Sequence, residues 1–316
     1  MSKVITVLYE PQGIDFKALA ERAAAGRAEI CMLPPFTQNV EIPADTVALI
    51  GELRRSHISV APNVKWVQTS FAGVESIIPA IGDGVTLTNA SGAFGEGISE
   101  YMLMYIFMLQ NRAREYLALQ AAHEWKPLMP TPLLCDSTVT VIGLGDLGGV
   151  LARKLKALGA KVRGVKRTAS AKPDYVDELF TTDDLDRALD GTDVVALCLP
   201  NTAETNEILS RERIFALKEG AIIVNAGRGN AIDQTALVEA LNANRVFAGL
   251  DVTKPEPLPA DDPLWDAPNL VLTPHISGPG ASAYAMRYNA ELFARNIDAF
   301  LSGKPLENVV DTTRGY

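Results

Sequence analysis

Cysteine, histidine and tryptophan are scarce in this chain of 316 residues, which contains three of each. The cysteines are Cys31, Cys135 and Cys198, an odd number without the spacing of a metal site. Because Cys31 and Cys198 lie inside apolar, strand-like runs, we expect buried, reduced thiols. No histidine is near any of them in sequence, and this disfavours a catalytic cysteine.

Positive charge and long apolar runs are scarce as well. The 29 basic residues are outnumbered by 38 acidic ones, the net charge is −9, and no dense basic stripe occurs, so nucleic acid and anionic membranes are disfavoured as partners. The longest apolar run, residues 101–109, is less than half of a membrane span. The N-terminal residues do not show the order of a secretory signal. We therefore expect a cytoplasmic protein.

The length allows two domains, each with its own core. In the first hundred residues short apolar runs alternate with amphipathic stretches, which predicts a small, flavodoxin-like α/β unit. The runs and stretches are residues 4–9, 16–25, 29–33, 47–50, 64–68 and 85–88. Prolines punctuate the loops between them, which favours short strands with irregular connections.

From residue 138 the alternation becomes regular. Strands are predicted at 138–142, 161–165, 193–199, 221–225, 246–250 and 270–273, with helices between them at 146–158, 183–189, 210–217 and 233–243. Six strands with intervening helices predict one doubly wound parallel (Rossmann) sheet. A last amphipathic helix at about 281–301 returns the chain to the first unit. We therefore predict a discontinuous substrate domain, 1–97 and 281–316, with a dinucleotide-binding domain, 98–280, inserted into it.

Residues 92–112 begin with small residues and continue as a long apolar helix, followed by a polar continuation to about residue 122. Its methionines and aromatic residues indicate a core helix, or a seam between domains or subunits. Residues 124–132, with Trp125 and three prolines, predict an exposed excursion, for which contact with a partner subunit is a minor alternative.

The chemistry starts from STVTVIGLGDLGG, residues 137–149. Gly143, Gly145 and Gly148 have the G-x-G-x-x-G spacing between a β-branched strand and a helix, and Asp146 and Leu147 lie inside the same turn. The first glycine permits the tight turn, the second lets a pyrophosphate approach, and the third lets the helix pack closely. The helix N-terminus favours phosphate. An ordinary tight turn is the alternative, but the flanking strands and helix favour a dinucleotide site.

The end of the second strand indicates which dinucleotide is bound. An acidic residue about 20 residues after the glycines normally holds the ribose hydroxyls, whereas arginine accommodates a 2′-phosphate. Here the strand ends in Lys166, Arg167 and Thr168, without a carboxylate. Arg167 can bind a phosphate through paired N–H donors, and Lys166 adds a point charge. NADP(H) is therefore favoured over NAD(H), which stays possible; the alternative is that both are solvated loop charges.

Elimination among the histidines favours one acid/base candidate. His57 is in a polar turn and His123 at a polar helix end, so both are predicted to lie on the surface. His275 instead follows the strand 270–273, at the carboxyl edge where open α/β sheets bind ligands. A structural loop histidine is the alternative at this position.

Two neighbouring strand ends carry further charged residues. Arg228 follows IIVNAGRG, and Asp251 and Glu256 lie in GLDVTKPEP. Single charges at strand ends are common, but this set suits hydride transfer to a 2-oxo acid. Arginine can pair with carboxylate and ketone oxygens, a protonated histidine can donate the proton, and a nearby glutamate favours the charged imidazolium.

In order and spacing, several pieces of the chain resemble the D-isomer-specific 2-hydroxyacid dehydrogenases over nearly the whole length. They are FAGVE (71–75), TNASG (88–92), VIGLGDLG, LCLPNTAET (197–205), NAGRG, GLDVTKPEPLP, LTPHIS and PLENVVD. The terminal RGY, together with Lys166 and Arg167, is similar to the NADPH-preferring glyoxylate/hydroxypyruvate reductase branch. The resemblance implies a homodimer.

The resemblance also implies roles for individual residues. Arg228 is then the substrate arginine, His275 the acid/base and Glu256 its partner, and the backbone of Ala72 and Gly73 binds the substrate carboxylate. The implied cofactor-lining residues, besides those of the glycine turn, are Leu199, Pro200, Thr205, Ala226, Gly227, Asp251, Ser277 and Gly278. No metal is implied.

The sequence thus predicts an NADP(H)-dependent reductase that converts a small 2-oxo acid, such as glyoxylate or hydroxypyruvate, to the D-2-hydroxy acid. One alternative is a dinucleotide-sensing, corepressor-like interaction protein on the same fold, which would tolerate loss of the charged residues. A dehydrogenase for a bulkier 2-hydroxy acid is another, because one sequence does not fix the pocket built partly from residues 40–53 and Trp125.

Overall fold

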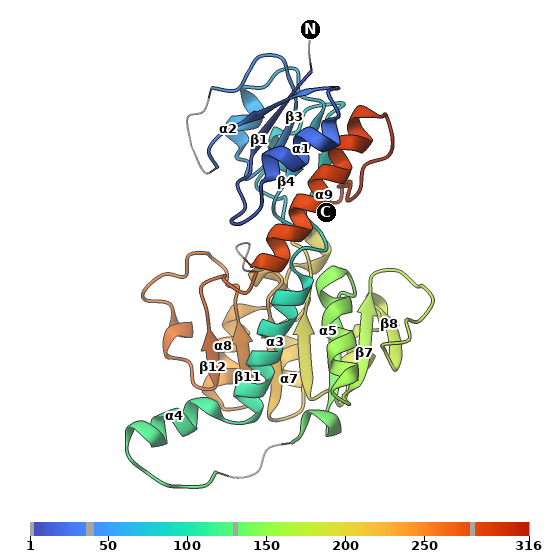
Figure 1. Cartoon of the computed structure of the whole chain (residues 1–316). Helices are drawn as coiled ribbons and strands as arrows, with labels where there is room; N and C mark the ends of the chain where they lie inside the picture. Colours follow the sequence, from blue (N-terminus) through green and yellow to red (C-terminus); the bar gives the residue numbers. More distant parts are fainter. Residues whose placement is uncertain (1–2, 36–40, 129–131, 279–281, 316) are drawn as a thin grey trace. The chain divides into compact units, whose positions relative to one another are not determined.

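The computed structural model describes residues 3–35, 41–128, 132–278 and 282–315 (Figure 1). The chain divides into two compact units, of which unit 1 comprises Met1–Phe94 with Pro279–Tyr316, and unit 2 comprises Gly95–Gly278. The sequence-predicted junctions stand at 97/98 and 280/281, and the second falls on residues outside the described ranges. The same holds for the first residue of the predicted helix 281–301, for residue 40 of the predicted pocket wall and for the last residue of the terminal RGY.

Unit 1 contains a five-stranded parallel sheet in the order β2-β1-β3-β4-β5. The strands are β1 (Val4–Leu8), β2 (Glu29–Met32), β3 (Thr46–Gly51), β4 (Trp66–Thr69) and β5 (Thr86–Thr88). Each falls on a sequence-predicted apolar run, so the small α/β unit is confirmed. The order is flavodoxin-like, and its direction reverses between β1 and β3.

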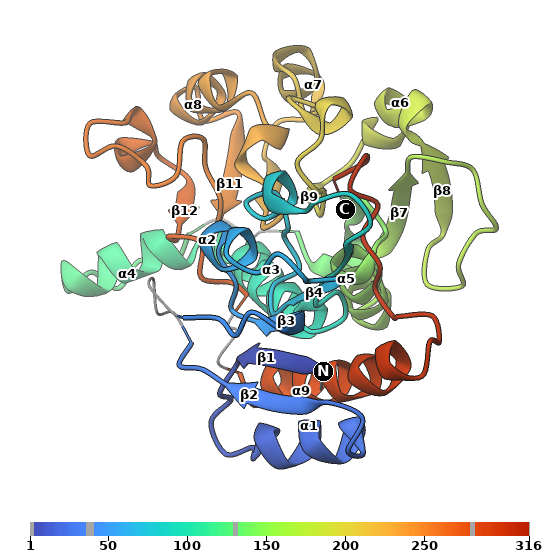
Figure 2. The ribbon, with the colours of Figure 1, turned by 90° about the horizontal axis from the view of Figure 1, so that it is seen from above.

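Two apolar layers cover the faces of this sheet. On one face α1 (Phe16–Ala24) and α9 (Ala283–Leu301) lie side by side (Figure 2). Phe16 and Phe293 of these helices pack with Trp66 of β4. On the other face, the short helix α2 (Arg55–Ser59) contributes Ile58 to a cluster with Leu49 and Leu87. A 3₁₀ turn, Ile78–Ala80, lies on the same side.

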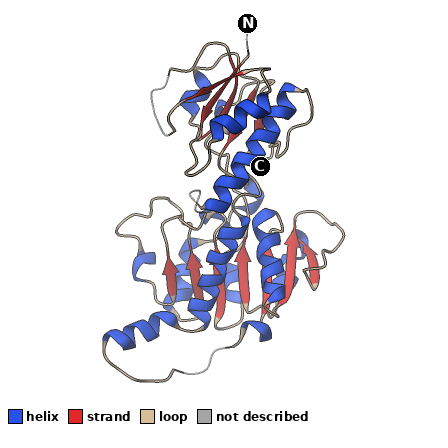
Figure 3. Cartoon of the chain, viewed as in Figure 1, coloured by secondary structure: helices blue, strands red, loops and turns tan. Residues whose placement is uncertain are grey.

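Unit 2 contains a seven-stranded parallel sheet in the order β12-β11-β10-β9-β6-β7-β8, drawn as parallel arrows in Figure 3. The strands are β6 (Thr138–Ile142), β7 (Lys161–Lys166), β8 (Glu178–Thr181), β9 (Val194–Leu197), β10 (Ala221–Asn225), β11 (Val246–Leu250) and β12 (Leu270–Leu272). The doubly wound parallel sheet is confirmed. Its order reverses between β6 and β9, where such sheets bind ligands.

The predicted number of six strands was wrong, because β8 was missed. This edge strand has the sequence ELFT and is only partly buried, so it has no continuous apolar run for the pattern to reveal. The strand predicted at 193–199 ends at Leu197, and Cys198 and Leu199 already belong to the following turn.

Helices cover both faces of the seven-stranded sheet. One face carries α3 (Gly95–Gln110) and α5 (Asp146–Ala157), which pack on it through Met102, Tyr105 and Leu151. The other face carries α6 (Leu185–Leu189), α7 (Arg211–Ala216) and α8 (Gln234–Asn242), grouped beyond the sheet in Figure 2. Five 3₁₀ turns, Leu134–Asp136, Thr182–Asp184, Ala203–Thr205, Gly229–Ala231 and Pro263–Asp266, complete the described part of unit 2.

The polar continuation predicted after α3 is a separate helix, α4 (Ala113–Ala121), which has no buried residue. The break lies at Arg112, whose φ of 53° ends the preceding helix. The Arg114 guanidinium donates to the backbone oxygen of Leu270 in β12. Trp125 is fully exposed, as predicted for this excursion, whose residues 129–131 lie outside the described part. None of the described helices is both long and apolar enough to cross a membrane.

Candidate active site

The glycine turn joins β6 to α5, and its backbone is closely packed at Gly143 and Gly148. Gly143 has a φ of 94°, and its N–H donates to the Val165 oxygen at 2.9 Å. A Cβ on Gly148 would stand 1.8 Å from the Gly143 oxygen, so only glycine permits this approach of helix and strand. Gly143 and Gly148 therefore have the steric roles predicted from the sequence.

Gly145 differs from its two neighbours, because a Cβ placed on it would meet no atom within 4 Å. The space beside it opens at the N-terminus of α5, where the first-turn N–H groups, including those of Asp146, Leu147 and Gly148, have no intrahelical acceptor. Open space next to the first N–H groups of a helix, at its positive end, suits a pyrophosphate. The turn thus fits a dinucleotide.

The end of β7 presents positive charge. Lys166 donates through Nζ to Ser170 Oγ at 3.1 Å, and Arg167 and Thr168 are exposed. The pKa of the Glu204 carboxyl lies below its usual range because of hydrogen bonds from its own backbone N–H and from Thr202, and the charge of Arg167 adds to this effect. The end of β7 and the segment after β9 therefore meet at the carboxyl edge of the sheet.

The turn after β9 is held from inside by Thr205. Its hydroxyl donates to the Pro200 oxygen at 2.7 Å and accepts the Thr202 N–H at 3.0 Å. Leu199 is only partly buried and lies beside Gly143, where a Cβ would come within 3.0 Å of its Cδ2. Leu199 thus borders the glycine turn, and Thr205 holds the loop that follows it through the Pro200 oxygen.

Arg228 lies in a turn that an unpredicted residue shapes. Asn225, the last residue of β10, is completely buried; its Oδ1 accepts the Gly227 N–H at 3.0 Å and its Nδ2 donates to the Arg228 oxygen at 2.9 Å. Ala226 is buried within the same turn. Arg228 is half-buried, and its Nη1 donates to the Gly227 oxygen at 2.8 Å. Asn225 is the only polar residue in the run AIIVN, and this was the feature of the sequence that could have revealed its role.

His275 and Glu256 form a pair, with Nδ1 of the histidine 2.8 Å from Oε2 of the glutamate. Oε1 of Glu256 accepts the Thr253 N–H at 3.0 Å, so the carboxylate is fixed from two sides. An ionised carboxylate only accepts hydrogen bonds, so Nδ1 carries the proton and Nε2 is left for another partner. The His275 side chain is 51% exposed, which leaves room for that partner.

A buried network holds the His275 turn. The Asp251 carboxylate, which is 1% exposed, accepts the Thr273 hydroxyl at 2.6 Å and the N–H groups of Ile276 and Ser277 at 2.9 and 2.8 Å. The backbone oxygen of Asp251 accepts the backbone N–H of His275 at 2.8 Å, and His275 has a φ of 53°. Asp251 and Ser277 therefore shape the backbone around the histidine, whereas Gly278 is exposed.

Tyr105 of α3 extends this network, because its hydroxyl bonds that of Thr273. Burial is the main cause that raises the pKa of Tyr105, so the hydroxyl keeps its proton. The sequence offered no signal for this contact, since the two residues lie in segments far apart in the chain. Tyr105 and Thr273 are therefore positioning residues that the sequence did not predict.

Ala72 and Gly73 belong to the loop after β4 in unit 1. The loop is anchored by Asn89, whose Nδ2 donates to the Ala72 oxygen at 3.0 Å, and by the Ala90 N–H, which donates to the Phe71 oxygen at 3.0 Å. The N–H groups of Ala72 and Gly73 donate to no acceptor among the described residues. Two consecutive amides of this kind suit an anionic group.

The surface position predicted for His57 was wrong. This histidine lies in α2, is 1% exposed, and accepts the Arg54 N–H through Nδ1 at 3.2 Å, so it caps the helix from inside. The polar sequence RRSHIS hid this role. His123 is exposed, as predicted.

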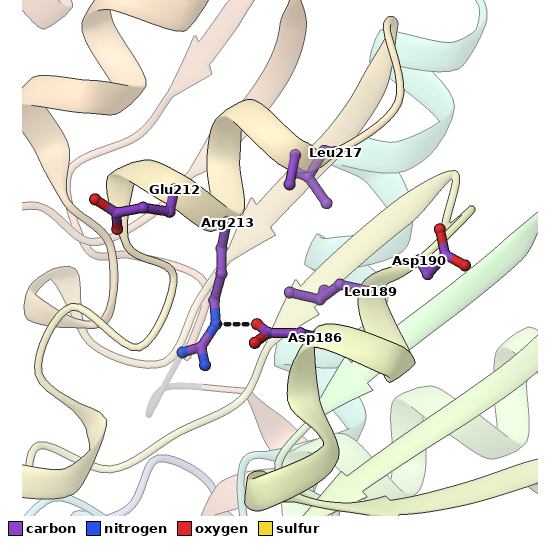
Figure 4. Close-up of a pocket in the computed structure, with 7 residues that line it drawn as sticks. Asp186, Leu189, Asp190, Glu212, Arg213 and Leu217 are labelled. Atoms are coloured by element: carbon purple, nitrogen blue, oxygen red, sulfur yellow. Dashed lines mark hydrogen bonds and ion pairs between the residues drawn. The ribbon is translucent and has the colours of Figure 1, made fainter.

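The three cysteines are free cysteines. Cys31 and Cys198 are partly buried, and burial raises the pKa of both thiols, whereas Cys135 is exposed. Within the described ranges no group of three metal-binding side chains occurs. A cavity of about 310 Å³ lies between α6 and α7, around the ion pair of Arg213 with Asp186, and contains none of the predicted site residues (Figure 4).

Comparison with known proteins agrees with this geometry. The family model for the D-isomer specific 2-hydroxyacid dehydrogenase NAD binding domain matches residues 103–277, more than half of the chain. A glyoxylate reductase from Thermofilum pendens is 33% identical over 257 residues, which cover 78% of this chain and 75% of the relative.

Two solved structures align with all of this chain and with all of their own chains. One is a D-isomer specific 2-hydroxyacid dehydrogenase from Xanthobacter autotrophicus Py2 in complex with NADPH and MES, with a TM-score of 0.84 and 28% identity. The other is an NADPH-dependent glyoxylate/hydroxypyruvate reductase from Sinorhizobium meliloti in complex with NADP and sulfate, with a TM-score of 0.82 and 30% identity. The chain is an enzyme that belongs to the family of D-isomer specific 2-hydroxyacid dehydrogenases.

Proposed function

We propose that this enzyme reduces a small 2-oxo acid of the glyoxylate or hydroxypyruvate type to the D-2-hydroxy acid, with NADPH as the reductant. The observation that carries the proposal is the 2.8 Å pair of His275 and Glu256. It lies at the same sheet edge as Arg228 and the glycine turn, since all of them follow the carboxyl ends of parallel strands.

The chain's own residues divide the work as follows. The bound nicotinamide supplies the hydride. Nε2 of His275 donates a proton to the 2-oxo oxygen, while Glu256 stabilises the imidazolium through Nδ1. Arg228 pairs with the oxygens of the oxo acid and orients it. The N–H groups of Ala72 and Gly73 bind its carboxylate, which makes unit 1 the substrate domain and unit 2 the dinucleotide-binding domain.

Two observations support the preference for NADP(H). No carboxylate ends β7, where NAD-binding domains use one to hold the ribose hydroxyls. Lys166 and Arg167 stand there instead, and both solved relatives described above contain the phosphorylated dinucleotide. The proposal assigns the glycine turn to the pyrophosphate and this cationic strand end to the 2′-phosphate. Leu199, Pro200, Ala226, Gly227, Asp251, Ser277 and Gly278 border the rest of the cofactor, and Thr205 supports them.

Oxidation of NADPH in the presence of a panel of 2-oxo acids tests the reaction. We expect consumption with glyoxylate and hydroxypyruvate, and larger kcat/KM values for them than for branched or sugar-derived 2-oxo acids. Tight NADPH binding without consumption in the presence of any of them contradicts the reductase. That outcome supports a dinucleotide-sensing interaction protein instead. A preference for the bulkier acids contradicts only the substrate class.

Replacing Arg167 by alanine tests the cofactor preference. We expect the KM for NADPH to rise about ten- to hundredfold, because a charged hydrogen-bonding partner of the 2′-phosphate is lost. The KM for NADH, which lacks this phosphate, should stay the same. Arg187→Ala, at an exposed arginine of α6, is the matched control. An equal rise for both cofactors contradicts the proposed phosphate contact.

Exposed apolar side chains support an assembly of two copies. Helix α4 buries none of its residues, and Leu117 and Trp125 are 59% and 102% exposed. Large apolar side chains of this kind are typical of protein interfaces. A homodimer therefore accompanies the proposed function, and a cytoplasmic location is proposed with it.

A further inference from the structure

Unit 1 contains a group of buried polar atoms that have no hydrogen-bond partner among the described residues. Among the described residues, five buried side-chain nitrogen or oxygen atoms have no hydrogen-bond partner. Two are the Nε atoms of Arg163 and Arg245, whose guanidinium groups donate through other nitrogens. The remaining three are Oε2 of Glu52, Oγ of Ser70 and Oδ1 of Asn289. Unpaired buried polar atoms are costly, so a cluster of them needs an explanation.

The three side chains come from neighbouring points at the carboxyl edge of the five-stranded sheet. Glu52 follows β3 and Ser70 follows β4, and the Ser70 N–H donates to the Gly51 oxygen at 2.9 Å. Asn289 of α9 reaches the same point, because its Nδ2 donates to the Ser70 oxygen at 3.2 Å. The Tyr9 ring, after β1, packs on Phe293, and its hydroxyl donates to the Met286 oxygen at 3.1 Å.

Tyr9, Glu52 and Asn289 influence one another electrostatically. Burial raises the pKa of Tyr9; the Asn289 side chain opposes this effect and the charge of Glu52 adds to it. Tyr9 therefore lies next to both residues. Burial also raises the pKa of Glu52 to about 7, because the carboxyl group has lost part of its contact with water. The Tyr9 hydroxyl therefore keeps its proton, and it lies beside the Glu52 carboxyl group, whose pKa is raised.

Loose packing does not explain the unpaired atoms, because the buried polar groups nearby are paired. Asn296 lies two turns after Asn289 on α9, and its Nδ2 donates to Gln68 Oε1 at 2.8 Å while its Oδ1 accepts the Glu307 N–H at 2.8 Å. The hydroxyls of Thr6 and Thr46 bond each other at 2.8 Å. Of these two asparagines on α9, Asn289 is the one whose Oδ1 has no partner in the described part of the chain.

The position of the cluster indicates a ligand. It lies where the strand order reverses between β1 and β3, the point at which open sheets of this order bind ligands. Ser70 precedes Ala72 by two residues, a span of at most about 7 Å along the chain. This span is comparable to the distance between the two ends of a three-carbon acid. A group bound here and a carboxylate bound at Ala72 can thus belong to one small molecule.

Taken with the proposed function, on which this inference rests, the chemistry of the three atoms selects a hydroxyl group. Asn289 Oδ1 can only accept a hydrogen bond, an ionised Glu52 also accepts, and the Ser70 hydroxyl can do either. We propose that Glu52, Ser70 and Asn289 form a subsite for a hydroxyl on carbon 3 of the substrate, and that they favour hydroxylated 2-oxo acids over unsubstituted ones.

Hydroxypyruvate and pyruvate test the subsite directly, because they differ by this one hydroxyl. We expect the ratio of their kcat/KM values to fall about tenfold or more in Glu52→Leu, since an apolar side chain cannot pair with the hydroxyl. Ser70→Ala should lower the ratio as well. Glu29→Leu, at an exposed glutamate of β2 in the same sheet, is the matched control and should leave the ratio unchanged.

A second measurement excludes a general loss of structure. The thermal unfolding midpoint of Glu52→Leu should equal or exceed that of the wild type, because an unpaired buried carboxyl group is removed. If this variant fails to fold, Ser70→Ala decides, since the Ser70 hydroxyl has no hydrogen-bond partner within the described ranges. A ratio unchanged in every folded variant overturns the subsite. Failure of the wild type to reduce either acid overturns the proposed function instead.

Discussion

Replacement of His275 by alanine should lower kcat for the 2-oxo acid about 10²- to 10⁴-fold, the usual contribution of a positioned general acid. The 51% exposed imidazole is held by Glu256 at one nitrogen and leaves the other for the substrate. Removing it takes away the proposed proton donor but none of the side chains that form the glycine turn. The Kd of NADPH, measured by fluorescence titration, should therefore stay within about twofold.

His123→Ala is the matched control, because His123 is also exposed and lies at the end of α4. Glu256→Gln sharpens the test further. The glutamine amide oxygen can still accept a hydrogen bond from Nδ1, but the negative charge that stabilised the imidazolium is lost. We therefore expect a smaller loss of kcat than for His275→Ala. If turnover survived in His275→Ala with several 2-oxo acids, the proton donor would have to be another group.

The second large effect is expected at the glycine turn. There one glycine-to-alanine substitution should lower the stability of the fold, and another should weaken cofactor binding. In Gly148→Ala the new Cβ would stand 1.8 Å from the Gly143 oxygen, and a backbone atom at this distance cannot turn aside. We expect the free energy of unfolding, from urea denaturation, to fall by about 3 kcal/mol.

Gly145→Ala should leave the fold intact and damage cofactor binding. Its Cβ meets no atom within 4 Å and its φ is −74°, so the free energy of unfolding should change by less than about 0.5 kcal/mol. The methyl group fills space that the pyrophosphate needs, and the Kd of NADPH should rise about ten- to hundredfold. Equal destabilisation by both alanines would show that the turn is only structural.

The strand ends were predictable because a parallel sheet brings them together without any knowledge of side-chain packing. Each apolar run predicts a strand, and the residue after it must lie at the common edge. Arg228, Glu256 and His275 could be found this way, and the pairing of His275 with Glu256 agrees with the expected partnership. The same rule failed for β8, whose partly buried edge position leaves no apolar run in the sequence.

Residues that act through other residues could not be predicted in this way. Tyr105 bonds Thr273, and Asn289 bonds Ser70, across separations of 168 and 219 residues, which no local pattern encodes. Local sequence was misleading for His57, because its charged neighbours suggested a surface turn while tertiary packing buried the imidazole. Glu52 could not be identified from the sequence either, since only the folded sheet buries its Oε2 away from hydrogen-bond partners among the described residues.

The way Asp251 holds the turn after β12 has an evolutionary consequence. Its carboxylate binds the backbone N–H groups of Ile276 and Ser277, so the support does not depend on which side chains these positions carry. Ile276 is 51% exposed and can be exchanged without a packing penalty. Mutations can therefore accumulate beside the histidine while its orientation is inherited unchanged. An enzyme built in this way can drift toward a new substrate without first losing the histidine that we propose as its proton donor.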